Sequence, residues 1–111
     1  MIYVEIRIKL PRHRVQEALD AWAATGAKWD EENMQKVGGK VIGCWSTQYG
    51  SKRGEITFLM AYPTLEARDE LQALIRKDPA FAKWMATVWR GDFAADSRIR
   101  VLKPAAFSAL K

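Results

Sequence analysis

The sequence has little of what a disulfide, a metal centre or a membrane span requires. It contains one cysteine, Cys44, and one histidine, His13, too few for an internal disulfide or a Cys/His zinc site. No apolar run approaches the roughly 18 residues of a transmembrane helix, and Glu5 and Arg7 come too early for the apolar core of a secretory signal. We therefore expect a soluble, cytoplasmic protein with no membrane span, no metal and no cofactor.

The composition is that of an ordinary globular domain. Of its 111 residues, 49% are hydrophobic and 28% are charged, which argues against intrinsic disorder and low complexity. We therefore expect a single domain over residues 1–111. With 18 basic and 13 acidic side chains, the formal net charge is +5, which permits an anionic partner without naming one.

The first ten residues alternate strictly between apolar and other side chains, which predicts a β-strand that ends at Pro11. One face of this strand carries only aliphatic side chains: Ile2, Val4, Ile6, Ile8 and Leu10. The opposite face carries Tyr3, Glu5, Arg7 and Lys9.

The rest of the chain predicts three further strands and two helical regions. Helical spacing covers 12–34, where Gly26 is expected to weaken the middle and Asp30 to lie on the exposed side or at a frayed end. Strands are expected at 40–49, 55–62 and 97–103. The second helical region starts at Thr64, restarts at Asp78-Pro79 and stops at Gly91. The order β-α-β-β-α-β predicts a ferredoxin-like α+β fold, with the helices on one face of an antiparallel sheet.

The face of the sheet without helices is expected to be covered by a second copy of the chain. The strand at 55–62 has apolar residues in both alternating sets, and the strand at 40–49 places Val41, Trp45 and Tyr49 opposite Ile42 and Cys44. Apolar residues on both faces indicate that both faces are covered. A twofold homodimer, with sheet facing sheet, satisfies this requirement.

Four segments, in their order along the chain, resemble the NIPSNAP family of dimeric α+β barrel proteins. They are Gly43-Cys44-Trp45-Ser46-Thr47, the segment 62–68, Asp78-Pro79 and the tail 103–110. The resemblance implies two subunits whose sheets close into one barrel around a cavity. The family has no defined biochemistry, and its wider superfamily includes cofactor-free monooxygenases, small-molecule isomerases and haem-degrading enzymes. If the chain is an enzyme, the resemblance implies a cofactor-free oxygenation or isomerisation.

The candidate ligand site lies on the helix-free face, where a ferredoxin-like sheet places the first strand between the third and the fourth. Guanidinium groups bind carboxylate or phosphate bidentately, so this face is predicted to bind a small anionic or amphipathic molecule. The predicted binding residues are Tyr3, Glu5, Arg7, Lys9, Trp45, Arg98 and Arg100. Phe58 and Met60 are expected to add apolar walls. The alternative is a cross-strand ion-pair ladder in which Arg7 or Arg100 satisfies Glu5.

The sequence allows three other interpretations of the protein's function. A non-enzymatic interaction or scaffold dimer, its barrel filled by its own side chains, is the main alternative to a ligand-binding protein. Catalysis by Glu5 is disfavoured, because neighbouring arginines keep the carboxylate ionised and weakly basic. An RNA-binding module is the least favoured class, since the stacking aromatics of such modules are replaced by Glu55 or Ile56 and by Thr57; we therefore expect no nucleic-acid partner.

Overall fold

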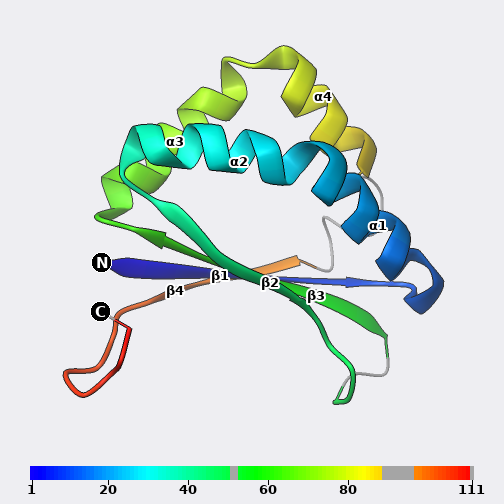
Figure 1. Cartoon of the computed structure of the whole chain (residues 1–111), viewed down its shortest axis with the longest axis horizontal. Helices are drawn as coiled ribbons and strands as arrows, with labels where there is room; N and C mark the ends of the chain where they lie inside the picture. Colours follow the sequence, from blue (N-terminus) through cyan, green and yellow to red (C-terminus); the bar gives the residue numbers. More distant parts are fainter. Residues whose placement is uncertain (51–52, 89–96, 111) are drawn as a thin grey trace.

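A four-stranded antiparallel sheet forms the lower layer of the molecule, and all the helices lie on one side of it (Figure 1). The computed structural model describes residues 1–50, 53–88 and 97–110. The strands are β1 (Ile2–Leu10), β2 (Lys40–Ser46), β3 (Gly54–Tyr62) and β4 (Ser97–Leu102), in the spatial order β2-β3-β1-β4. This is the predicted ferredoxin-like α+β arrangement, with β1 between β3 and β4.

The first helical region is one long rod with a change of winding in its middle. It consists of α1 (Val15–Ala21), a π-helical turn (Trp22–Gly26) and α2 (Ala27–Met34), with short 3-10 turns at its two ends (Arg12–Arg14 and Gln35–Val37). The irregularity expected at Gly26 is therefore a π-type turn. His13 is exposed in the first 3-10 turn.

The second helical region is two helices, α3 (Leu65–Arg76) and α4 (Pro79–Val88). Both predicted caps are confirmed: Thr64 Oγ1 accepts a hydrogen bond from the Ala67 N–H at 3.2 Å, and Asp78 Oδ1 accepts one from the Phe81 N–H at 3.0 Å. The predicted stop at Gly91 lies outside the described residues. No helix in the described ranges has the length and hydrophobicity needed to cross a bilayer.

The core lies between the sheet and the helices, where the aliphatic face of β1 meets one face of β3. Residues paired directly across two strands point to the same side of the sheet. Ile6 pairs with Phe58 and Val4 with Met60, so Phe58 and Met60 face the helices. The prediction that they line the helix-free face is therefore wrong.

The other face of β3 is mixed rather than apolar. It carries Glu55, Thr57, Leu59 and Ala61, which pair with the polar or aromatic set of β1. Tyr62 belongs to the helix-facing set and is 1% exposed. The apolar residues of the mixed face are Leu59 and Ala61, and the register of β1 on β3 shows that this set, rather than the set with Phe58, lies on the helix-free face.

Strand β2 contains a bulge that changes its alternation. The pairing shifts between Val41 and Gly43, so Val41 pairs with Met60 and Cys44 with Phe58, both on the helix side. Trp45 pairs with Thr57 on the opposite, helix-free side. The predicted grouping of Val41 with Trp45 is wrong, because one extra residue reverses the alternation beyond the bulge. Cys44 is exposed rather than buried.

Candidate functional site

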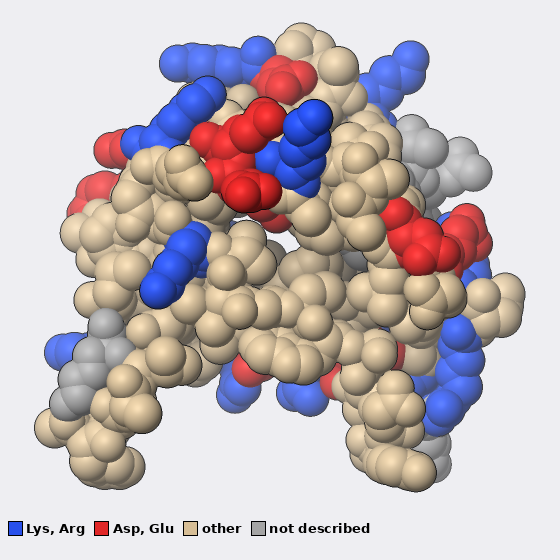
Figure 2. Space-filling model, viewed as in Figure 1, with Lys and Arg blue, Asp and Glu red and all other residues tan. Residues whose placement is uncertain are grey.

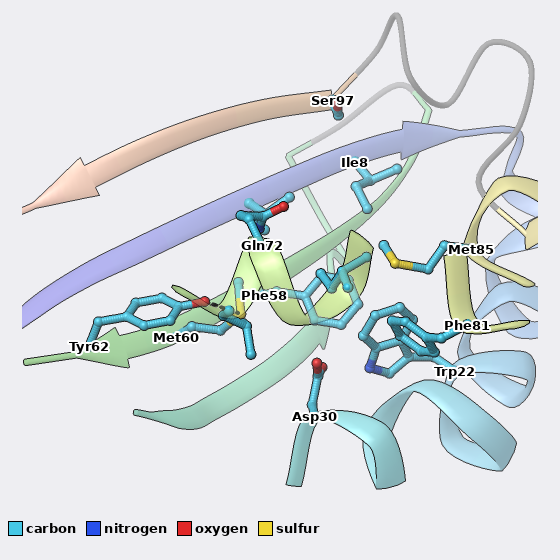
Figure 3. Close-up of a pocket in the computed structure, with 13 residues that line it drawn as sticks. Ile8, Trp22, Asp30, Phe58, Met60, Tyr62, Gln72, Phe81, Met85 and Ser97 are labelled. Atoms are coloured by element: carbon cyan, nitrogen blue, oxygen red, sulfur yellow. Dashed lines mark hydrogen bonds between the residues drawn. The ribbon is translucent and has the colours of Figure 1, made fainter. Parts of the chain in front are cut away.

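A cavity of about 240 Å³ lies between the sheet and the helices, and we call it the helix–sheet cavity (Figure 3). Side chains from β1, β3, β4, the π-helical turn, α2, α3 and α4 line it. Its apolar lining residues are Ile6, Ile8, Trp22, Phe58, Met60, Leu71, Ile75, Phe81 and Met85. Its polar lining residues, among those described, are Asp30, Tyr62, Gln72 and Ser97. A largely apolar wall with a few polar groups is the usual composition of a small-molecule site.

A second hollow, of about 330 Å³, adjoins the first between α2 and β2. Asp30, Trp22 and Phe58 line both, so these three side chains stand at the boundary between the two spaces. Figure 2 shows the surface hollowed between α2 and β2.

The π-helical turn determines that Asp30 faces the cavity. Trp22 and Asp30 are eight positions apart, and in a regular α-helix their directions would differ by about 80°. A π-type turn takes up one extra residue, which rotates the following chain back by about 100° and brings the two directions to within about 20°. Both side chains therefore point into the cavity. The prediction that Asp30 is exposed is wrong for this reason.

The environment of Asp30 is unusual for a carboxylic acid. The residue is 7% exposed, and its carboxyl forms no hydrogen bond or ion pair with any residue in the described part of the chain. No fully buried side-chain oxygen among the described residues lacks a hydrogen bond, so the carboxyl oxygens of Asp30 keep contact with solvent in the cavity. Burial without a partner disfavours the charged form, and it raises the pKa of Asp30 from 3.8 to about 7. At neutral pH this carboxyl can therefore either accept or donate a proton.

Tyr62 presents a second titratable group to the cavity. Burial is the main cause that raises the pKa of Tyr62 to about 12; the Arg68 charge lowers it and the Asp30 charge raises it. The phenol thus stays protonated and is a hydrogen-bond donor at neutral pH. Its hydroxyl donates to Met60 Sδ at 3.6 Å, and a thioether is a weak acceptor. A bound molecule with an oxygen acceptor can compete for this donor.

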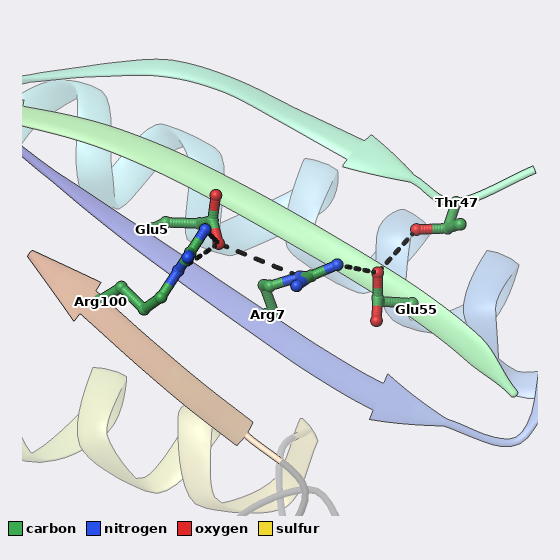
Figure 4. A network of polar contacts seen from close by, with 5 residues as sticks. All are labelled: Glu5, Arg7, Thr47, Glu55 and Arg100. Atoms are coloured by element: carbon green, nitrogen blue, oxygen red, sulfur yellow. Dashed lines mark hydrogen bonds and ion pairs between the residues drawn. The ribbon is translucent and has the colours of Figure 1, made fainter. Parts of the chain in front are cut away.

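The helix-free face carries a ladder of charged side chains that crosses three strands (Figure 4). Arg100 donates to Glu5 Oε1 from Nε at 3.2 Å and from Nη2 at 2.9 Å, and Arg7 Nε lies 4.0 Å from the same oxygen. Arg7 Nη2 also donates to Glu55 Oε1 at 3.2 Å, as does Thr47 Oγ1 at 2.9 Å. Two guanidinium groups thus meet two carboxylates, as in the ion-pair ladder that the sequence offered as an alternative.

All seven binding residues predicted from the sequence share this helix-free face, and none of them lines the helix–sheet cavity. Arg7 and Arg98 are paired across β1 and β4, and such like-charged neighbours are stabilised by an anion between them. Trp45 is 51% exposed, whereas Tyr3 is 8% exposed. The role of these residues in ligand binding stays a prediction.

The two sites differ in their chemical capacity. The helix-free face holds strong, paired charges, whereas the helix–sheet cavity holds one largely buried carboxyl without an ion-pair partner among the described residues. Within residues 1–50, 53–88 and 97–110, no three His, Cys, Asp or Glu side chains gather in a way that could hold a metal ion. The cavity is therefore the candidate site for chemistry carried by side chains of the chain itself.

Comparison with solved structures identifies the same fold in other proteins. A NIPSNAP family protein of unknown function from Agrobacterium tumefaciens is 23% identical, with a TM-score of 0.76 over 99% of this chain and 94% of the other. A predicted antibiotic biosynthesis monooxygenase from Caulobacter crescentus is 17% identical, with a TM-score of 0.65 over 94% and 89%. A dimeric ferredoxin-like protein from an uncultured marine organism is 11% identical, with a TM-score of 0.62 over 96% and 94%.

The family assignment comes from a match to the whole domain. No curated protein matches the sequence. The NIPSNAP family model matches residues 3–109, which is nearly all of the 111 residues. The resemblance seen in the motifs at 43–47, 62–68 and 103–110 is thus confirmed, and the chain belongs to the NIPSNAP family.

Proposed function

We propose that the protein binds a small amphipathic molecule in the helix–sheet cavity, with the apolar part among the aromatic side chains and one polar group against Asp30. The observation that carries this proposal is the cavity of about 240 Å³ into which one largely buried carboxyl points, with no ion-pair partner among the described residues. An anionic ligand fits the cavity poorly when Asp30 is ionised, because like charges repel strongly at a buried site. A hydroxyl or carbonyl compound fits best.

The surrounding aromatic side chains favour a ring-shaped ligand. Trp22 lies 5.0 Å from Phe58 and 5.6 Å from Trp84 between ring centroids, and Phe81 lies 5.5 Å from Trp84. Trp22, Phe58 and Phe81 line the cavity, and Trp22 and Phe81 lie at the end opposite Tyr62 (Figure 3). Flat apolar ligands gain both area burial and ring contacts against such a wall.

Binding can be tested with 2-naphthol, an aromatic alcohol, by isothermal titration calorimetry. We expect Ile75→Trp, which enlarges a side chain that lines the cavity, to weaken 2-naphthol binding at least tenfold. The matched control is Leu65→Trp on the same helix, at a position that is 51% exposed and does not line the cavity. If 2-naphthol binds equally to both variants, or does not bind the unaltered protein, the cavity is not the ligand site.

We also propose that the protein is a homodimer in which a second copy covers the helix-free face. The dimeric ferredoxin-like neighbour supports this, as does the shape of the chain. Residues 47–50, which follow β2, and the segment 103–110 extend beyond the sheet on its helix-free side (Figure 1), and the surface between them is hollowed (Figure 2). Tyr49 and Phe107, which belong to these two extensions, are each 94% exposed. Large exposed apolar groups at the edges of a concave face are typical of a protein interface.

Trp45 provides the test of the dimer. Its ring lies over Gly43, where an added Cβ would be 2.6 Å from the ring, so the indole lies flat on the helix-free face. We expect Trp45→Glu to convert a dimer at micromolar concentration into the 12.6 kDa monomer in analytical ultracentrifugation, since it replaces a large apolar contact by an unpaired charge that the partner would bury. Leu65→Glu is the matched control, because Leu65 is also 51% exposed but belongs to the helix layer. A monomeric unaltered protein would disprove the dimer.

The cavity also bears on the reaction class. An oxygenation needs dioxygen as a co-reactant, whereas an isomerisation by proton transfer needs only a base and a hydrogen-bond donor. Asp30 and Tyr62 are those two groups. Between the two reactions implied by the resemblance, the cavity favours isomerisation. A scaffold dimer with no ligand is the alternative, and the 2-naphthol titration distinguishes it.

A further inference from the structure

Three polar groups from three different elements meet at the helix–sheet cavity. Asp30 points into it from α2, the Tyr62 hydroxyl from β3 and the Gln72 amide from α3 (Figure 3). Asp30 and Tyr62 are close enough that the Asp30 charge raises the pKa of the phenol. A base and a neutral donor, placed around one apolar space, can act on the two ends of a ligand that undergoes enolisation.

We propose that the cavity isomerises small unsaturated ketones, with Asp30 as the proton carrier and the Tyr62 hydroxyl as the donor to the oxygen that becomes negative. This inference rests on the proposed ligand site. The substrate is an apolar ketone with a double bond one carbon removed from conjugation with the carbonyl. Its product is the conjugated ketone.

The reaction is balanced without any co-reactant. The Asp30 carboxylate takes a proton from the carbon next to the carbonyl. The electron pair of the broken C–H bond forms a carbon–carbon double bond, and the carbonyl π pair moves to the oxygen, which accepts a hydrogen bond from Tyr62. Asp30 then returns the proton to the far end of the dienolate. The carboxylate is restored, the double bond has moved, and nothing has been oxidised or reduced.

Asp30 suits this role better than Glu5, which the sequence already disfavours as a base. Glu5 accepts two hydrogen bonds from Arg100, and it lies on the helix-free face, away from the helix–sheet cavity. Asp30 has no such partner in the described chain. A base whose pKa lies near the working pH transfers protons most effectively.

The groups around Asp30 do not offset its burial. Glu31, Lys40 and Cys44 line the adjoining hollow together with Asp30. Tyr62 lines the helix–sheet cavity together with Asp30, and the charge of Arg68 lowers the pKa of Tyr62. Burial alone raises the pKa of Asp30, to about 7. The isomerisation rate should therefore rise as pH increases through about 7 and level off above it.

The test uses 3-cyclohexen-1-one and follows its conversion into 2-cyclohexen-1-one by the ultraviolet absorbance of the conjugated product. We expect the unaltered protein to accelerate conversion above buffer, Asp30→Asn to lose about 100-fold or more and Tyr62→Phe to lose about tenfold to 100-fold. Glu32→Gln, the same chemical change at an exposed position of α2, should keep the rate and its pH profile. Circular dichroism verifies that the variants are folded.

Binding is measured separately, by saturation-transfer NMR with cyclohexanone. If cyclohexanone binds but conversion is no faster than in buffer, or if Asp30→Asn is as active as the unaltered protein, the isomerase inference is wrong and the ligand site stands. If 2-naphthol binds and cyclohexanone does not, the substrate class is wrong and the inference fails. If neither binds, the ligand site and the inference both fail.

Discussion

Replacing Asp30 by asparagine should make the protein more stable at about pH 8, by about 1–3 kcal/mol in the free energy of unfolding. Burial raises the pKa of Asp30 from 3.8 to about 7 in the folded chain, so the folded state holds the proton more tightly than the unfolded state. The difference of about three pKa units corresponds to about 4 kcal/mol of lost stability once the carboxyl is ionised. Asparagine removes this cost, less the penalty of burying an amide with unpaired donors.

The sign of the effect depends on pH in a way that distinguishes it from a packing change. Below the unfolded pKa of 3.8 the carboxyl is protonated in both states and costs nothing. Between 3.8 and about 7 the unfolded state loses its proton first, so stability falls as pH rises, and above about 7 the full cost is present. The advantage of Asp30→Asn should therefore grow from about pH 4 to about pH 8.

Urea unfolding at a fixed protein concentration measures this difference, because the stability of a dimer depends on concentration. The measurement is made at about pH 4 and at about pH 8. Glu32→Gln, at an exposed position of the same helix, should change the free energy of unfolding little at either of these pH values. An advantage of Asp30→Asn that is the same at both pH values would contradict the prediction. Asparagine at this position would thus stabilise the fold while abolishing the proposed proton transfer, a trade-off often found where a group serves function at a cost to stability.

Much of the fold follows from local patterns in the sequence. The aliphatic alternation of β1 has only one arrangement that buries Val4 and Leu10, both of which are 0% exposed. The side chains of Thr64 and Asp78 accept hydrogen bonds from backbone N–H groups, and each residue caps the start of a helix at the predicted place. These signals are reliable because each depends on a few neighbouring residues.

The candidate site could not be predicted in the same way, because it depends on two local irregularities and one long-range register. The π-helical turn at Trp22–Gly26 turns Asp30 inward, whereas regular helical spacing places it outside. The bulge near Gly43 reverses the faces of β2. The pairing of Ile6 with Phe58 decides which face of β3 meets the helices. The one signal available in the sequence was Gly26 inside a helical pattern, which indicated irregular winding but not its direction.

Replacing Gly26 by alanine should close part of the cavity. A Cβ at this position would lie 2.6 Å from Trp22 Cδ2 and 2.7 Å from Cε3, closer than atoms can approach. The indole is packed against Phe58 and Trp84, so the clash must be relieved by moving the ring or by distorting the turn. Alanine favours a helix over glycine by about 1 kcal/mol, yet overpacking typically costs about 1–3 kcal/mol, so we expect little or no net stabilisation.

The effect on ligand binding should be larger than the effect on stability, because Trp22 lines both the helix–sheet cavity and the adjoining hollow. We expect Gly26→Ala to weaken 2-naphthol binding at least tenfold in calorimetry and to change the near-ultraviolet circular dichroism of the aromatic cluster. Thr25→Ala is the matched control, since it places the same residue in the same turn at an exposed position and should alter neither signal. Unchanged affinity in Gly26→Ala would show that Trp22 does not shape the ligand site. The π-helical turn would then serve only to direct Asp30 inward.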